Sequence, residues 1–204
     1  KMTDPQDNPP GNIPPDLTLD HRTGWPSDLR LLVKRYPREV WPTHPNLGEL
    51  SKFWLGRHDM FRELNGALLQ ASDHLKEGTV PPEEFRAWFL PRIRFFLQQL
   101  NGHHMIEDHE YFPLLTKVEP NLSRGFDVLE NDHEMIHEGL LSLQDAGNGL
   151  AQALAGPADR IGFAADTMSN SLSGFLKSLN RHLDDEEDLI IPILLDRGET
   201  ALGG

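Results

Sequence analysis

Two segments of the chain each carry a histidine and a glutamate four residues apart. They are FLQQLNGHHMIEDHEYFP at 96–113 and FLKSLNRHLDDEEDLIIP at 175–192, an offset of 79 residues. On a helix, this spacing places both side chains on one face, so that His103 with Glu107, and His182 with Glu186, can reach one inward point. Imidazole and carboxylate donors together suit first-row metals such as iron, manganese or zinc. The repeat therefore predicts a metal site.

The repeat extends to a whole helical hairpin, because the same offset pairs His137 with His58. Two hairpins, each with a histidine on its first helix and His-xxx-Glu on its second, predict an all-α, antiparallel four-helix bundle. The predicted metal ligands, all at positions that such a bundle would turn inward, are His58, His103, Glu107, His133, His137, His182 and Glu186. Seven donors exceed the needs of one ion, so we expect two metal ions bridged by Glu107 and Glu186.

The donors divide unequally between the two ions. One ion takes His58 and His103, and the other takes the remaining three histidines of the predicted set. The position 79 residues before His133 is Trp54. We therefore hypothesise that the first ion lacks a third imidazole, has Trp54 among its apolar neighbours and keeps an open coordination position. A small ligand binds or reacts at such a position.

Other assignments remain open for some positions. Glu130 or Glu134 could replace His137, because both precede a histidine in an ExxH pattern, and Glu187 is a rival of Glu186. His104 points about 100° away from His103 on a helix, so we expect it at the surface or behind the ligands. The histidines without a repeat partner, which we expect to be solvated, are His21, His44, His74 and His109.

Proline and glycine positions divide the chain into elements. We expect helices at 46–77, 82–118, 122–155 and 158–197, with Pro91 and Pro113 bending the second one. Nine of the 16 prolines lie at or before Pro45, so residues 1–45 should form an extended, partly mobile arm on a bundle domain at 46–204. A short helix is expected between Pro26 and Pro37. Trp25 and Trp41 beside it should pack on the bundle or on a second subunit.

Composition excludes several classes of function. The chain has 32 acidic and 19 basic residues, a net charge of -13, which opposes binding to nucleic acid or anionic membranes. It has no cysteine, so disulfides, thiolate zinc sites and iron-sulfur clusters are excluded. No apolar segment resembles a signal peptide or a membrane-spanning helix, and we expect a cytoplasmic protein.

In order and spacing, the predicted ligands resemble those of the hemerythrin-like HHE cation-binding family. Its pattern is a histidine, HxxxE, HxxxH, and a histidine followed by an acid, and it is matched over about 46–197. The resemblance implies a non-haem site with two iron ions, bridged by an oxo or hydroxo group and held by five histidines and two carboxylates. Oxygen-carrying members place an aspartate five residues after the last histidine, whereas Glu186 comes four residues after it. In this feature the chain departs from the pattern of reversible oxygen carriers, but the departure leaves the predicted metal site intact.

Three functions are consistent with such a centre. The first is a protein that binds or senses a small diatomic ligand, oxygen or nitric oxide, or senses redox state. The second is an enzyme that decomposes hydrogen peroxide or another small oxidant, and the third is iron storage or delivery. A structural zinc site is less consistent, because zinc sites with mixed donors usually have four ligands. We expect no partner beyond the small ligand or peroxide, apart from a possible homodimer.

Overall fold

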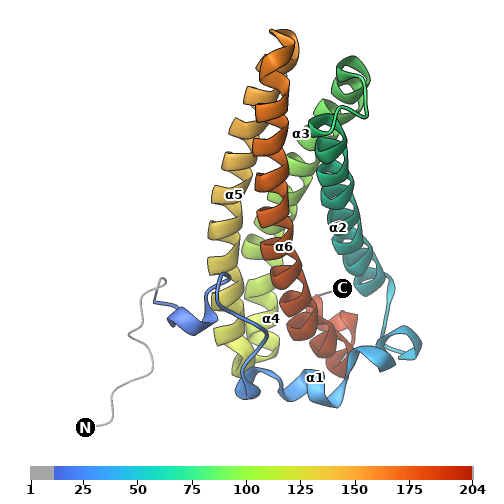
Figure 1. Ribbon diagram of the computed structural model, residues 1–204. Coiled ribbons are helices and arrows are strands. Elements are labelled where there is room, and N and C mark those ends of the chain that lie inside the picture. Colours follow the sequence, from blue (N-terminus) through green and yellow to red (C-terminus); the bar gives the residue numbers. More distant parts are fainter. Residues whose placement is uncertain (1–11, 204) are drawn as a thin grey trace.

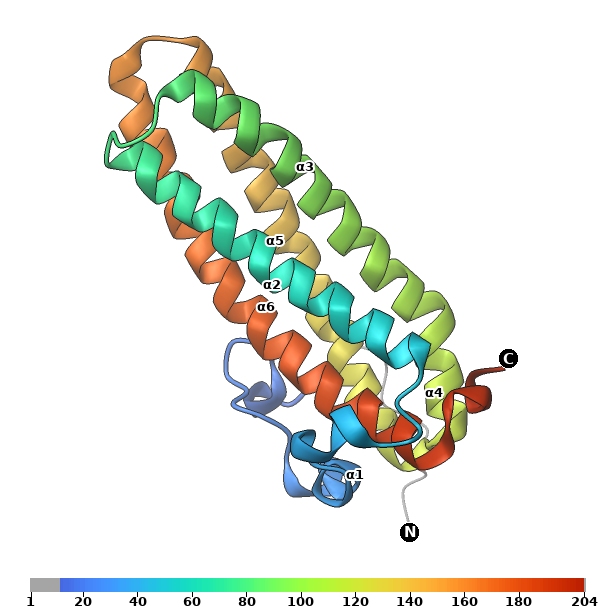
Figure 2. The same cartoon turned by 90° about the vertical axis from the view of Figure 1, so that its right-hand side faces the viewer.

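Four long antiparallel helices form the body of the protein (Figure 1). The computed structural model describes residues 12–203, and within this range all regular structure is helical. The long helices are α2 (Glu49–Lys76), α3 (Pro82–Ile106), α5 (Ser123–Ala155) and α6 (Ile161–Arg197). Each contacts two others, in the cyclic order α2, α3, α5, α6. Figure 2 shows the same bundle along its length from another side. The predicted four-helix bundle is confirmed.

The second predicted helix is interrupted near its predicted metal ligands. After α3 comes a π-helical turn, Glu107–Tyr111, and then the short helix α4 (Phe112–Val118). Pro113 has no N–H for the carbonyl four residues earlier, and the N–H of Phe112 bonds to the carbonyl of Glu107, five residues back. The wider turn therefore begins at a predicted metal ligand, whereas α3 continues through Pro91 without a break.

The N-terminus of α2 is capped by a residue from the other end of the chain. The carboxylate of Glu199 accepts hydrogen bonds from the N–H groups of Leu50 and Ser51, at 3.4 and 2.8 Å. A Cβ at Gly48 would displace the carboxylate of Glu199, so glycine permits this close approach. The cap fixes the start of the helix that carries Trp54 and His58.

Residues 12–47 pack on the bundle of their own chain. They include the predicted short helix, α1 (Leu31–Arg35), which contacts α6. Trp25 and Trp41 are buried in one hydrophobic cluster with residues of α5 and α6. Part of the predicted extended, mobile arm, residues 1–11, lies outside the described residues. Figure 1 shows the described part along one end of the bundle, and we call residues 12–47 the arm.

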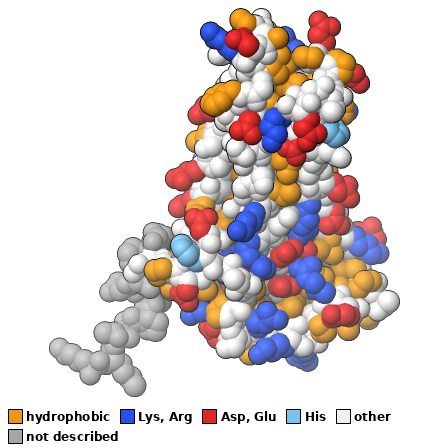
Figure 3. Space-filling model, viewed as in Figure 1, with side chains coloured by type: hydrophobic (Ala, Val, Ile, Leu, Met, Phe, Trp, Pro, Cys, Tyr) orange, Lys and Arg blue, Asp and Glu red, His pale blue; other side chains and the backbone are white. Residues whose placement is uncertain are grey.

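Two hydrophobic clusters fill the bundle from end to end. One contains Phe61, Phe96 and Leu183, and the other contains Trp54, Phe112 and Leu189 together with the arm. Acidic and basic side chains are interspersed over the face seen in Figure 3. Within residues 12–203, no helix has both the length and the apolar character needed to cross a membrane.

Candidate metal centre

A compact set of buried histidines and carboxylates lies where the two hydrophobic clusters meet. All four long helices contribute, and the side chains are His58 from α2, His103 and His104 from α3, Glu107 from the π-helical turn, His133 from α5, and His182 and Glu186 from α6. Their possible ligand atoms form two groups, and within each group all atoms lie within 4.8 Å of one another. Two adjoining sites for cations are thus outlined.

The first group, which we call the two-histidine half, contains His58, His103, Glu107 and Glu186. Nε2 of His103 lies 2.6 Å from Oε1 of Glu107 and 3.2 Å from Nε2 of His58. Nε2 of His58 lies 3.1 Å from Oε1 of Glu186. The indole N–H of Trp54 donates to Oε1 of both glutamates, at 3.0 and 3.1 Å. The donors of this half are therefore hydrogen-bonded to one another and to Trp54.

The second group, the three-histidine half, contains His104, His133, His182 and the other oxygen of Glu107. Oε2 of Glu107 lies 3.3 Å from Nε2 of His133, and Oε2 of Glu186 lies 3.1 Å from Nε2 of His182. Each carboxylate thus directs one oxygen to each half, as the predicted bridging role requires.

Five buried atoms of the three-histidine half lack a hydrogen-bond partner. They are Nε2 of His104, His133 and His182 and Oε2 of Glu107 and Glu186. A buried polar atom without a partner costs free energy, so such atoms are uncommon in folded proteins. Here five of them converge from three sides and include both neutral nitrogen and anionic oxygen donors. This arrangement fits a bound metal cation, which would satisfy all five.

The structure brings together six of the seven predicted ligands and leaves out His137. Its ring is exposed and lies 3.3 Å from the side-chain oxygen of Asn101, so the expectation that His137 turns inward is wrong. Four residues after His133, it lies about 6 Å further along α5, beyond the level of the centre. The alternatives Glu130 and Glu134 are also exposed.

His104 takes the place expected for His137, although the sequence analysis assigned it to the surface or behind the ligands. It is 5% exposed, and its ring stacks on that of His133, with centroids 3.9 Å apart. Because α3 packs between α2 and α5, two successive residues of α3 can both point inward. His103 therefore faces α2, and His104 faces α5.

Three histidines are oriented by carboxylates behind them. Nδ1 of His58 donates to Glu187 at 2.8 Å, and Nδ1 of His133 donates to Asp108 at 2.7 Å. Asp108 and Glu187 are equivalent in the repeat, since 108 plus 79 is 187. Glu187 is thus a partner of His58 and not a rival of Glu186.

The third oriented histidine is His182, whose Nδ1 donates to Asp132 at 3.0 Å. In all three rings, Nδ1 faces a carboxylate and Nε2 faces the centre, so a metal ion there could bind Nε2 while Nδ1 donates to the carboxylate.

Electrostatics prepare the donors for a cation. Burial and the Glu186 charge oppose ionisation of Glu107, but His103, which lies 2.6 Å from its Oε1, outweighs them and the pKa of Glu107 is lowered to about 2. Burial, together with the neighbouring imidazoles of His133 and His182, holds the pKa of His104 well below its usual range. The carboxylate of Glu107 is therefore ionised and His104 is neutral at pH 7, the states in which both can bind a metal.

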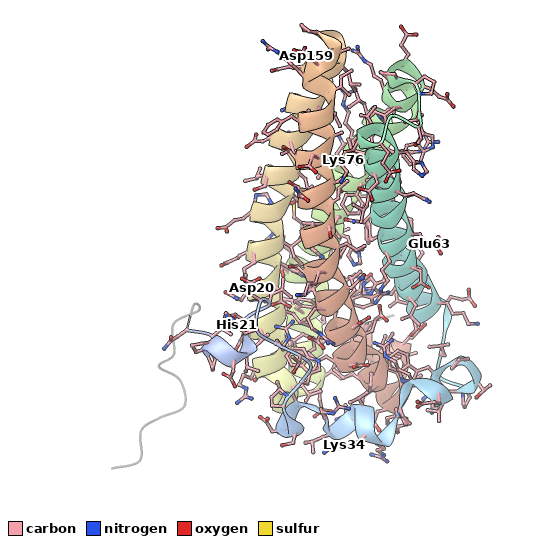
Figure 4. All side chains as sticks on the ribbon, viewed as in Figure 1. Asp20, His21, Lys34, Glu63, Lys76 and Asp159 are labelled. Atoms are coloured by element: carbon pink, nitrogen blue, oxygen red, sulfur yellow. The ribbon has the colours of Figure 1, made fainter. Side chains whose placement is uncertain are left out.

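The remaining histidines lie outside the centre. His21, His74 and His109 are exposed, as expected, and Figure 4 labels His21 on the arm. His44 is half-buried and accepts a hydrogen bond from the N–H of Asn46 at 3.0 Å, so its expected solvation is only partial.

A scan against protein-family models matches residues 49–194 to the hemerythrin HHE cation binding domain. The chain belongs to this family. A search of curated proteins and a search of solved structures found no match. Membership of the hemerythrin HHE family and the buried cluster of histidines and glutamates together fit a metal-binding protein. The matched region excludes residues 12–48, so the arm is an addition to the hemerythrin-like bundle.

Proposed function

We propose that this protein is a non-haem di-iron protein that binds or senses a small ligand, such as oxygen or nitric oxide, or redox state, at an open position of one ion. The observation that carries the proposal is the unequal division of imidazoles, three in one half of the centre and two in the other. An ion with fewer protein ligands retains a position for an external one.

The ligand set follows from the two halves. His58, His103, Glu107 and Glu186 would hold one ion, and His104, His133 and His182 would hold the other with the same two glutamates. Iron bound there would supply one-electron redox chemistry and a coordination position open to exchange. The protein's own contribution is to fix the donors and to exclude water from them.

The repeat indicates which position of the two-histidine half lacks a histidine. The residue equivalent to His104 is Leu183, since 104 plus 79 is 183, and its side chain is fully buried. His104 comes four residues before Asp108, which reaches His133 on α5. Leu183 comes four residues before Glu187, which reaches His58 on α2. Leu183 therefore faces the two-histidine half from α6, as His104 faces the other half from α3.

This comparison moves the proposed vacancy from Trp54 to Leu183. Trp54 remains a neighbour of the two-histidine half, where it donates a hydrogen bond to both bridging carboxylates. Trp54, Leu55 and Ile190 lie beside His58 and Glu186. Apolar side chains therefore surround these donors and limit the access of water, which favours a small uncharged ligand.

The acids around the centre favour binding over acid-base catalysis. Asp108, Asp132 and Glu187 each accept a hydrogen bond from a histidine, and Asp132 and Glu187 also pair with arginines. Their lone pairs are engaged in holding the rings. A small ligand that needs no proton transfer is therefore the best match to this site.

Metal analysis and spectroscopy test the proposal. We expect two irons per chain in protein purified from its own host, and one zinc per chain would reject the proposal. After anaerobic reduction, re-exposure to air should produce absorption bands that disappear again when oxygen is removed. Fast irreversible oxidation, or peroxide turnover faster than that of free iron, would instead support the enzyme alternative.

A variant tests the position of the vacancy. Leu183→His offers the two-histidine half the imidazole that it lacks, so azide binding should be suppressed while two metal ions are retained. The matched control is Leu183→Met, which keeps the volume without adding a nitrogen ligand and should still bind azide. Undiminished azide binding in a fully loaded Leu183→His protein would contradict the assignment.

A further inference from the structure

A buried arginine from the arm lies between two helices of the bundle. The guanidinium of Arg22 donates to both oxygens of Asp132 on α5, at 3.0 and 2.5 Å, and to Oδ2 of Asp185 on α6, at 2.6 Å. It also donates to the carbonyl of Leu17 at 2.8 Å. The side chains of Arg22, Asp132 and Asp185 are all fully buried. This is the arrangement of a permanent structural ion pair, with the charge supplied from outside the bundle.

The same arginine is connected to the metal centre through one atom. Oδ2 of Asp132 accepts hydrogen bonds from both Arg22 and Nδ1 of His182. The side chain of Asp132 therefore cannot rotate without breaking its contact with Arg22. As a result, the orientation of the His182 ring depends on a residue 160 positions earlier in the chain.

The arm supplies a second, weaker link to the other half of the centre. Arg38 pairs with Glu187 at 3.0 Å, and Glu187 holds Nδ1 of His58. The side chain of Arg38 is 43% exposed, and Glu187 also pairs with Arg62 of α2. Because Arg62 provides a substitute and solvent screens the pair, we expect Arg38 to matter less than Arg22.

We propose that Arg22 is a positioning residue of the metal centre, which controls through Asp132 and His182 how firmly the three-histidine half holds its ion. The inference rests on the proposed metal centre and assigns it a component outside the region that matches the family. The arm then acts as a part of the site, and its docking and metal binding favour each other by linkage.

The expected effect follows from the charges. Without Arg22, Asp132 loses the donor that holds both of its oxygens, and the carboxylate is free to turn away from His182. Loss of a contact behind a metal-binding histidine weakens metal binding by about 10- to 100-fold. The effect should be confined to one ion, because the histidines of the other half have no contact with Asp132 among the hydrogen bonds of residues 12–203.

The test measures the release of two ferrous ions from each chain to an excess of chelator under anaerobic conditions. In Arg22→Gln, one kinetic phase should accelerate about 10- to 100-fold and the other should stay unchanged. Arg35→Gln is the matched control, because Arg35 is an arginine of the same arm with a 68% exposed side chain. It should release both ions at the wild-type rates.

A double-mutant cycle separates positioning from folding. Asp132→Asn leaves Arg22 paired with Asp185, so it should fold even if Arg22→Gln does not, and it should accelerate the same phase. The double variant should release its ions no faster than Asp132→Asn alone. Equal acceleration of both phases, unchanged release in Asp132→Asn, or additive effects would overturn the inference.

The two proposals fail in different ways. A wild-type protein that binds fewer than two irons contradicts the proposed function before any variant is compared. A wild-type protein with two irons and with release rates insensitive to Arg22 contradicts the role of the arm alone.

Discussion

The two halves of the metal centre share both carboxylates but differ in how their donors are prepared. In the three-histidine half, five buried donor atoms have no hydrogen-bond partner and are held apart by the helices that carry them. In the two-histidine half, His58 and His103 contact each other, and the indole N–H of Trp54 donates a hydrogen bond to Oε1 of both glutamates. The donors of the three-histidine half are free to bind an ion directly. The donors of the two-histidine half must first break their contacts with one another, so metal bonds there replace hydrogen bonds. We expect the ion in the two-histidine half to be the one that exchanges an external ligand.

The largest expected effect is the loss of both ions, after which the two halves of the centre no longer differ in bound metal. Glu107→Ala deletes an oxygen from each half, so bound metal should fall from two ions to fewer than one per chain, measured by elemental analysis. Thermal stability should fall with it, because buried donors remain unpaired. The control is Glu110→Ala, an exposed residue of the same π-helical turn, which should keep both ions. Unchanged metal content in Glu107→Ala would refute the bridging role.

The next effect breaks one half and spares the other. His104→Ala removes an imidazole from the three-histidine half, so about one ion per chain should remain, whereas His137→Ala should keep two. This pair of variants also decides between the sequence-based ligand and the one that the structure places at the centre. Loss of an ion from His137→Ala, with His104→Ala unaffected, would reverse the assignment.

A smaller effect is a difference in affinity between the halves. Titration of metal-free protein with ferrous iron should show two steps, the first one at the three-histidine half. Breaking the contact between His58 and His103 costs about 1 kcal/mol, so the second step should be about 5-fold weaker on this account alone. His104→Ala should then remove the tighter step. A titration with a single step, in which both sites bind iron equally tightly, would contradict the proposed difference between the two halves.

The smallest effect concerns α2, which contributes to the two-histidine half only. Glu199→Ala removes the cap on this helix and should reduce the free energy of unfolding by about 1 kcal/mol. Hydrogen bonds from Ser51 and Leu50 outweigh burial and lower the pKa of Glu199. Its stabilisation is therefore complete above its usual pKa and disappears as pH falls through the lowered value.

Urea unfolding of the metal-free protein at several pH values checks this prediction. The difference between wild type and Glu199→Ala should be constant at neutral pH and should shrink in acid. A difference that grows as pH falls would contradict the role of the ionised cap. Glu119→Ala serves as a control for general effects of charge, because it removes a different carboxylate, one that pairs with Arg197.

The arm and His104 show where reasoning from the sequence stops. Glu187 and Asp108 could have been found, because they are equivalent in the repeat and both follow a bridging glutamate. His104 has no such signal, since its equivalent is a leucine and its direction depends on the packing of α3 between two helices. Arg22 has none either, because nothing in the residues around it indicates a partner on α5.

The sequence by itself determined the bundle and the two HxxxE pairs, from which two sites with shared carboxylates are predicted. These depend on helical periodicity and on a repeated spacing, which are local properties of the chain. Only the tertiary structure decided which histidine completes the larger half and which residues of the arm hold the rings in place. Those choices depend on the rotation and the level of each helix against its neighbours, and side chains distant in the sequence set both.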